Sequence, residues 1–226
     1  MEYLLDTANL EEIKKYQEII NITGVTSNPT ILKKEGKIDL FAHLRKIREL
    51  IGNEKTLHVQ VVSEDCEGMV QDALTILEKV DSLVYIKIPT NEEGLKAMRQ
   101  LKQKGVHITA TAIYTIAQGF MAMEAGADFI APYYNRMENL NIDPMEVIES
   151  LAKMIEKYHY PIKILAASFK NMNQVNNAFM KGAQTATMGV DVIAAALSHP
   201  SIDKAVKDFN QDFKSVYGQD AKLQNF

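Results

Sequence analysis

The stretch "SLVYIKIPT", residues 82–90, combines the pattern of a buried β-strand with one basic side chain. Its run from Leu83 to Ile88 is apolar and rich in β-branched and aromatic residues, which favours a strand inside the protein. Lys87 interrupts this run near its end, two residues before Pro89. A buried ammonium group is costly unless it pairs with a carboxylate or loses its proton. The placement of this lysine therefore calls for a chemical or a structural reason.

Similar short apolar segments recur along the whole chain, with amphipathic helical patterns between them. Between the third and fourth segments, for example, Met69, Val70, Ala73, Leu74 and Leu77 recur at helical spacing. We predict eight strands, at residues 2–7, 22–27, 57–62, 83–88, 107–112, 128–133, 162–168 and 185–189. Thr90 and Glu93 have the spacing of a capping box that begins the helix after the fourth strand.

Eight strands alternating with helices in a chain of 226 residues favour a single (β/α)8 TIM barrel, an α/β fold. A doubly wound sheet is the competing architecture, but no glycine-rich fingerprint follows the first strand. We assign residues 1–199 to the barrel. Residues 200–226 form an extra C-terminal helix and tail, with an apolar stripe made of Ile202, Ala205, Val206, Phe209, Phe213 and Val216. Because such a stripe needs a covering surface, we expect it to pack on a neighbouring subunit.

Composition and charge exclude several classes of function. The chain has 25 basic and 29 acidic residues, a net charge of −4, without a block of like charges. Nucleic acid and membrane surfaces are therefore poor partners. The start of the chain has no signal-peptide pattern, and no apolar run is long enough to span a membrane, so we predict a cytoplasmic protein. Cys66 is the only cysteine, which excludes an intrachain disulfide, and no metal-ligand spacing is present. We expect no metal and no cofactor.

Active sites of such barrels lie at the carboxyl ends of the strands, and polar residues are found at almost every predicted strand end. They are Asp6, Thr26, Asn28, Gln60, Lys87, Thr111, Tyr133, Arg136 and Ser168. Most also have an ordinary structural explanation. Asp6 could cap a helix, Asn28 could belong to a turn, and Gln60 or Thr111 could be satisfied core residues. The two histidines at strand starts, His58 and His107, are interpreted as structural.

Lys87 is harder to explain by structure alone. Its structural alternatives are a lysine whose stem packs while its head reaches water, or a buried ion pair with Asp6. Its chemical alternative is a neutral amine, made nucleophilic by a lowered pKa. Such an amine attacks a ketone to form a Schiff base, and the protonated imine then withdraws electrons from a neighbouring carbon–carbon bond. That is the chemistry of an aldolase.

Seven motifs, in this order and spacing, resemble the small transaldolase family, and most closely its fructose-6-phosphate aldolase branch. They are "LLDTAN", "GVTSNPTI", "HVQVV", "YIKIPT", "TATAIY", "APYYNRM" and "LAASFK", and the resemblance extends over about residues 1–217. The resemblance implies a (β/α)8 barrel, sugar phosphates with small ketones and aldehydes as substrates, and a homo-oligomer, either a pentamer or a decamer.

The resemblance also implies roles for the polar residues. Lys87 would be the Schiff-base lysine and Asp6 the acid that handles hydroxyl protons. Gln60, Thr111 and Tyr133 would hold a catalytic water. On the substrate-binding side, Asn28 would bind a ketose hydroxyl beside Thr26, while Arg136 and Ser168 would bind phosphate. Two positions depart from the aldolase pattern: Thr109 replaces an apolar residue, and Thr26-Ser27 replaces the commoner Thr-Thr. Both departures put the substrate range in doubt.

Three functions of different kinds remain open at this point. The first is an aldolase that cleaves fructose 6-phosphate to dihydroxyacetone and glyceraldehyde 3-phosphate. The second is a transaldolase that transfers the dihydroxyacetone unit to another aldose. The third is a sugar-phosphate-binding barrel without catalysis, which has no use for a buried lysine. Gln60 and Tyr133 favour the aldolase, because transaldolases of similar sequence carry glutamate and usually phenylalanine at these positions.

Overall fold

The computed structural model describes all residues from 1 to 226 and contains a closed barrel of eight parallel strands. Each strand is hydrogen-bonded to its two neighbours in chain order, and β8 closes the ring against β1. The strands are β1 (Glu2–Asp6), β2 (Ile22–Thr26), β3 (Thr56–Gln60), β4 (Tyr85–Pro89), β5 (Ile108–Ile113), β6 (Phe129–Pro132), β7 (Lys163–Ala166) and β8 (Thr185–Met188). All eight predicted strands are confirmed, with ends that agree within two residues.

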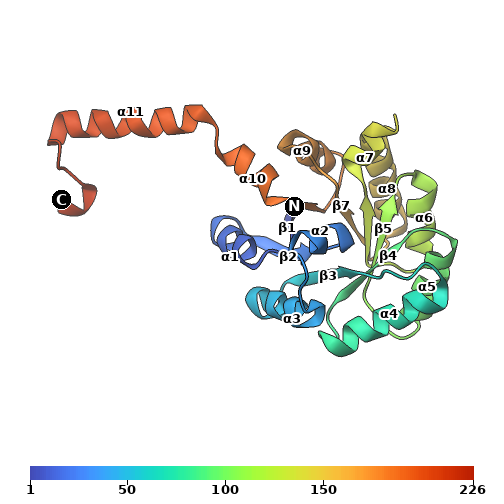
Figure 1. The fold of residues 1–226 in the computed structure, drawn as a ribbon. Helices are drawn as coiled ribbons and strands as arrows, with labels where there is room; N and C mark the ends of the chain where they lie inside the picture. Colours follow the sequence, from blue (N-terminus) through green and yellow to red (C-terminus); the bar gives the residue numbers. More distant parts are fainter.

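Helices follow the strands and surround the barrel, as Figure 1 shows. They are α1 (Leu10–Ile19), α2 (Pro29–Lys34), α3 (Leu40–Ile51), α4 (Cys66–Lys79), α5 (Glu92–Lys102), α6 (Ile116–Glu124), α7 (Tyr134–Asn139), α8 (Pro144–Tyr158), α9 (Met172–Met180), α10 (Val190–Leu197) and α11 (Pro200–Tyr217), with a short 3₁₀ turn at Leu223–Asn225. One core of 49 buried apolar residues fills the layer between barrel and helices. No helix is long and apolar enough to cross a bilayer.

The predicted capping box at the start of α5 is wrong. Asn91 is the N-cap, and its side chain accepts a hydrogen bond from the backbone N–H of Gly94. Thr90 still belongs to the barrel, because its N–H and its hydroxyl both donate to the carbonyl of Thr111. Glu93 instead accepts from the N–H of Cys66. A Cβ atom at Gly94 would lie 1.8 Å from the Pro89 carbonyl, so this tight strand-to-helix turn requires glycine.

The last helix, α11, extends away from the barrel and buries none of its residues (Figure 1). Ile202, Val206, Phe209 and Val216 from its apolar stripe are at least half exposed. Phe213 is partly covered, by Tyr217 and by Phe226 of the tail, and Ala205 is also partly buried. The apolar face of α11 therefore has no covering surface within the single chain.

The interior of the barrel is more polar than the layer around it. Strand register places His58 opposite Tyr85, Gln60 opposite Lys87, and Lys87 opposite Thr109. Since side chains alternate between the two faces of a strand, these residues all project into the barrel. His58 is fully buried there, as expected for a structural histidine. His159 and His199 are exposed, whereas the His43 ring is partly buried and hydrogen-bonded to the Ala8 carbonyl.

Candidate active site

A cavity of about 220 Å³ opens at the carboxyl ends of the strands. Six of the nine residues predicted from the sequence line it: Asp6, Asn28, Lys87, Tyr133, Arg136 and Ser168. These residues come from the carboxyl ends of five strands, β1, β2, β4, β6 and β7, from the turns that follow them and from the short helix α7. The barrel thus brings together side chains that are up to 162 positions apart in the sequence, the span from Asp6 to Ser168.

Lys87 lies at the bottom of this cavity, with only 4% of its surface exposed. Its Nζ donates a hydrogen bond to the carbonyl of Ser27 at 3.0 Å. It is absent from the ion pairs of the protein, so the alternative of a buried pair with Asp6 is not formed. Burial lowers the pKa of Lys87; the negative charge of Asp6 opposes this shift, and the positive charge of Arg136 adds to it. The amine is thus prepared to lose its proton.

Asp6 is held in place by the neighbouring strand. Its Oδ1 accepts a hydrogen bond of 2.6 Å from the hydroxyl of Thr26, which in turn contacts the hydroxyl of Thr187 at 2.6 Å. Thr26 is fully buried and does not line the cavity itself. Its contact with Asp6 leaves the other carboxylate oxygen available to a ligand. Thr26 is therefore placed to orient Asp6 rather than to touch a substrate.

Tyr133 and Thr111 form a second pair of polar groups near Lys87. Their hydroxyl oxygens are 2.8 Å apart, and both residues are buried. Gln60 is opposite Lys87 in the register of β3 and β4, but it lines two neighbouring surface pockets instead of the Lys87 cavity. Its Oε1 is buried without a hydrogen-bond partner. A buried acceptor of this kind is costly unless it is satisfied, which is consistent with a site for water.

The loops after β6 and β7 are joined by backbone hydrogen bonds. The N–H groups of Tyr134 and Asn135 donate to the carbonyls of Ala167 and Ser168. Ser168 has φ of 64°, in the left-handed region that non-glycine residues seldom occupy. Such strained residues cluster at functional sites. The junction holds Arg136 and Ser168 on one wall of the cavity, with the Arg136 guanidinium 4.5 Å from the centre of the Tyr133 ring.

Three charged residues of the same cavity were not predicted from the sequence: Lys34, Lys170 and Asp191. Lys170 follows Ser168 by two positions, so the "SFK" motif could have indicated a second cation beside the serine. Lys34 ends α2, and nothing in its sequence context distinguishes it from a surface lysine. The rim therefore carries three basic side chains, those of Lys34, Arg136 and Lys170, which suits an anionic substrate.

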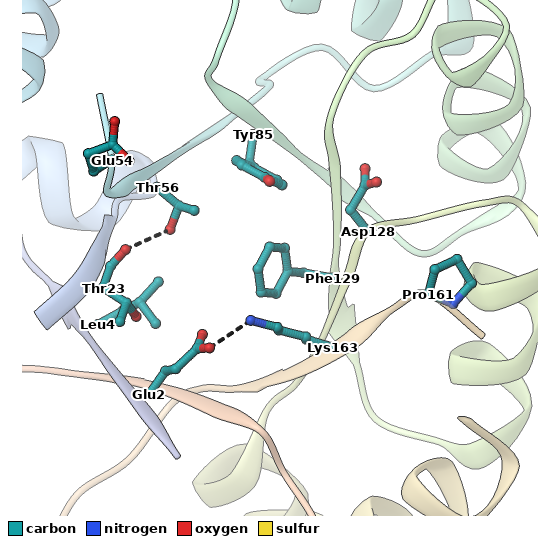
Figure 2. A pocket seen from close by; sticks show the side chains of 10 residues that line it. All are labelled: Glu2, Leu4, Thr23, Glu54, Thr56, Tyr85, Asp128, Phe129, Pro161 and Lys163. Carbon is teal, nitrogen blue, oxygen red and sulfur yellow. Dashed lines mark hydrogen bonds and ion pairs between the residues drawn. The ribbon is translucent and has the colours of Figure 1, made fainter. Parts of the chain in front are cut away.

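A larger cavity, of about 430 Å³, opens at the amino ends of the strands and is shown in Figure 2. Its basic side chain, Lys163, forms an ion pair of 2.7 Å with Glu2. Asp128 pairs with Lys102 and also accepts from the backbone of Ile108. The floor is aromatic, with Tyr85 and Phe129 in edge-to-face contact. Charges here are mostly neutralised within the protein, so this cavity lacks the reactive groups of the opposite end.

The cavity at the carboxyl ends combines a nucleophile, a carboxylate and a cationic wall. A desolvated amine can attack a carbonyl, Asp6 can accept or return a proton, and Arg136 can bind a phosphate. Nowhere in the chain do three or more His, Cys, Asp or Glu side chains come together at a spacing that suits a metal ion. Such a combination of groups can handle the carbonyl of a small phosphorylated molecule.

The family model described as "Transaldolase/Fructose-6-phosphate aldolase" matches residues 3–225, nearly the whole chain. The chain belongs to this family. Among its members, a protein of Streptococcus pneumoniae named "Probable fructose-6-phosphate aldolase" is 55% identical over 213 residues, which are 94% of this chain and 96% of that protein. The resemblance drawn from the sequence motifs is confirmed. As a member of this family, the chain is expected to act on sugar phosphates.

Among solved structures, the barrel resembles thiamine phosphate pyrophosphorylase from Pyrococcus furiosus. The TM-score is 0.59, over 82% of this chain and 83% of the other, at 12% sequence identity. Identity this low supports the barrel fold and says nothing about the chemistry. The family membership and the cavity around Lys87 are what bear on function.

Proposed function

We propose that the protein is a class I aldolase that cleaves fructose 6-phosphate reversibly to dihydroxyacetone and glyceraldehyde 3-phosphate. The observation that carries this proposal is the Lys87 amine, buried at the bottom of the cavity without a carboxylate partner. Both structural explanations for this lysine lose support, because its head neither reaches bulk water nor pairs with Asp6. A protein that only bound sugar phosphates would not need it. Family membership and the aldolase name of the 55% identical relative support the same assignment.

In the proposed reaction, neutral Lys87 Nζ attacks C2 of the ketose, and loss of water from the carbinolamine gives a protonated imine. Asp6 accepts the proton of the C4 hydroxyl while the C3–C4 bond breaks, and the bonding electrons move into the imine to form an enamine. Glyceraldehyde 3-phosphate leaves. The enamine is then protonated at C3, and water hydrolyses the imine to release dihydroxyacetone and regenerate the amine.

We assign Tyr133, Thr111 and Gln60 to the second half of the reaction, where they would hold the water that hydrolyses the imine and help to deliver the proton to the enamine. The 2.8 Å contact between the Tyr133 and Thr111 hydroxyls gives a water molecule both donors and acceptors. The unpartnered Oε1 of Gln60 offers a further acceptor on the strand next to Lys87. A phenol can present a proton at this place, whereas the phenylalanine usual in transaldolases cannot. This difference favours release of dihydroxyacetone over its transfer.

The remaining residues are assigned to substrate binding. Arg136 and Ser168 would hold the phosphate of the ketose, with Lys170 beside them. Asn28 uses its side-chain oxygen to cap α2, where it accepts from the N–H of Ile31. Its amide NH₂ group therefore stays free to donate to a ketose hydroxyl. Thr26 would act through Asp6, to which it donates a short hydrogen bond.

We further propose that the protein is a cytoplasmic homo-oligomer, a pentamer or a decamer, and the exposed apolar face of α11 supports the association of subunits. Covering Val206, Phe209 and Val216 by a neighbouring subunit would remove a large apolar surface from water. Light scattering of the full chain should give a mass several times that of one subunit, and deletion of residues 200–226 should lower it. A monomeric full chain would contradict this part of the proposal.

The reaction is tested by incubating the protein with fructose 6-phosphate alone and measuring free dihydroxyacetone. An aldolase releases it without an acceptor, whereas a transaldolase retains it as the enamine until an acceptor aldose arrives. The parallel measurement adds erythrose 4-phosphate and follows the transfer product. Faster transfer than release would replace the aldolase assignment with that of a transaldolase, with Lys87 in the same role.

A further inference from the structure

His58 makes two hydrogen bonds inside the barrel that the proposed mechanism does not use. Its Nδ1 lies 2.8 Å from the hydroxyl of Thr109, and its Nε2 lies 2.8 Å from the hydroxyl of Thr56. The side chain is fully buried, with its ring stacked on Tyr85 at a centroid distance of 4.9 Å. Gly24 makes room for Thr56, because a Cβ atom at Gly24 would lie 2.1 Å from the Thr56 hydroxyl. Both ring nitrogens are thus satisfied by built-in partners.

The direction of these hydrogen bonds follows from the carbonyl of Thr23, which ends the series and can only accept. Thr56 is placed to donate its hydroxyl hydrogen to the carbonyl of Thr23, at 3.4 Å, and this assigns the Nε2–H of His58 as the donor to the Thr56 oxygen. Nδ1 is then the unprotonated nitrogen of a neutral ring, and the Thr109 hydroxyl donates to it. Burial lowers the pKa of His58, and the charges of Lys87 and Arg48 lower it further, which keeps the ring neutral.

The bond between His58 and Thr109 joins two strands that are not neighbours. His58 projects from β3 and Thr109 from β5, while β4 lies between them. On β4, His58 is opposite Tyr85 and Thr109 is opposite Lys87. The His58 ring stacks on Tyr85, two residues before Lys87 on the same interior face. The hydrogen bond therefore crosses the inner face of β4 between Tyr85 and Lys87, on the side of the lysine away from the cavity mouth.

We propose that His58 and Thr109 are positioning residues for Lys87, and that their hydrogen bond forms the floor on which the lysine side chain rests. The inference rests on the proposed Schiff-base role of Lys87. A firm floor keeps the Lys87 stem from sinking toward the amino end and holds Nζ at the cavity. Because the Thr109 hydrogen is turned toward His58, the lone pairs of its oxygen point away from that ring. Thr109 lies opposite Lys87 in the strand register, so this polar floor also limits the desolvation that lowers the lysine pKa.

Other charged and titratable groups also act on Lys87, and they stay in place when the floor is altered. Asp6 approaches from β1 and Arg136 from α7, and both influence the Lys87 pKa. Tyr133 lines the same cavity from the end of β6. Tyr85 lies below the floor, stacked between His58 and His107. Removing only the floor hydrogen bond therefore isolates its contribution.

The test measures how fast dihydroxyacetone and sodium cyanoborohydride label Lys87 between about pH 5.5 and 9.5. Cyanoborohydride reduces the protonated imine to a stable secondary amine, and peptide mass mapping locates it. Dihydroxyacetone carries no titratable group, unlike a phosphate ester with a pKa near 6. The midpoint of the pH profile therefore reports on the protein.

Thr109→Val and His58→Phe should each move this midpoint to lower pH, by about one unit, because an apolar floor desolvates the Lys87 amine further. Both should slow labelling at the plateau. The double variant should shift no further than the single ones, because all three lack the same bond. Thr109→Ser keeps the hydroxyl and should keep the midpoint. Thr185→Val is the matched control, since it removes a buried hydroxyl that bonds only to the Ile164 carbonyl.

Two failures can be told apart. Unchanged midpoints in Thr109→Val and His58→Phe, equal to that of Thr185→Val, would overturn the positioning role while Lys87 remains the labelled residue. Labelling of a different residue in the unaltered protein would overturn the proposed function, and the positioning role with it. Normal circular dichroism in each variant shows that a changed profile does not come from unfolding.

Discussion

The two ends of the barrel both carry lysines and carboxylates, but these groups form ion pairs at one end and not at the other. At the amino end, Lys163 pairs with Glu2, as Figure 2 shows, and Asp128 pairs with Lys102. At the carboxyl end, Lys87 is buried next to a backbone carbonyl, without a carboxylate partner. The amino-end cavity is the larger, about 430 Å³ against 220 Å³. The comparison teaches that cavity size does not locate the chemistry here; the difference lies in which charges the protein leaves unneutralised.

The largest expected difference in activity is between variants that remove one lysine at each end of the barrel. Lys87→Met should lower cleavage of fructose 6-phosphate by about 10⁴-fold or more, because no other group can form the covalent intermediate. Lys163→Met at the amino end should change the rate less than about twofold, since the exposed pair with Glu2 contributes little. Initial rates of dihydroxyacetone release measure both. Comparable losses in the two variants would remove the distinction between the ends.

A smaller effect is expected from removing one phenol oxygen at each end. Tyr133→Phe deletes the partner of the Thr111 hydroxyl and should slow cleavage about 10²-fold, within the range of lost proton-transfer catalysis. Tyr85→Phe keeps the ring that stacks on His58 and should leave the rate near that of the unaltered protein. Steady-state kinetics with fructose 6-phosphate decide the point. A loss in Tyr85→Phe as large as that in Tyr133→Phe would argue against the assignment of Tyr133.

The cationic wall gives the next effect, which depends on the substrate. Arg136→Ala should raise KM for fructose 6-phosphate about tenfold to a hundredfold, because a charge-assisted hydrogen bond to phosphate is lost. In the synthetic direction, KM for unphosphorylated glyceraldehyde should stay nearly constant. Lys102→Ala, at the amino end, should change neither value. Equal changes for both substrates would make Arg136 a structural residue that only packs against Tyr133.

The smallest effect concerns stability and follows from the lowered pKa of Lys87. Unfolding restores the ordinary pKa, so the unfolded chain binds more protons than the folded one between the two values, and stability rises with pH there. At pH values below the pKa of Lys87 in the folded protein, the lysine is charged in both states, and the free energy of unfolding is lowered by the full cost of burying that charge. Lys87→Met should therefore unfold at a higher denaturant concentration than the unaltered protein at neutral pH, and the difference should fade as the pH approaches 10.5, the ordinary pKa of a lysine. Urea titrations at several pH values measure this difference, and Lys163→Met should show no such gain.

Much of the fold could be predicted from the sequence, because the signal is local. Apolar segments such as "LVYIKI" occur eight times with helical patterns between them, and eight is the number of strands in the closed barrel. The capping of α5 could not be predicted, since Thr90 and Asn91 are both good N-caps. The choice depends on Thr90 being held by the carbonyl of Thr111, on another strand.

The candidate site was predictable where a polar residue ends an apolar strand, as Asp6 and Lys87 do. Lys34 and Lys170 escaped because they follow no strand directly, and a rim lysine resembles any surface lysine in the sequence. His58 was interpreted as structural because it stands at the start of its strand. Its bond to Thr109 crosses an intervening strand, and the barrel register alone brings the two together.

The central claim is that Lys87 forms a Schiff base, and borohydride reduction in the presence of fructose 6-phosphate tests it most directly. The reduced protein is digested, and the peptide that carries the added mass is identified. We predict one adduct, on Lys87, with loss of activity in proportion to labelling, and no adduct on Lys163 or in the Lys87→Met variant. An adduct on another lysine, or full activity after complete labelling, would contradict the claim.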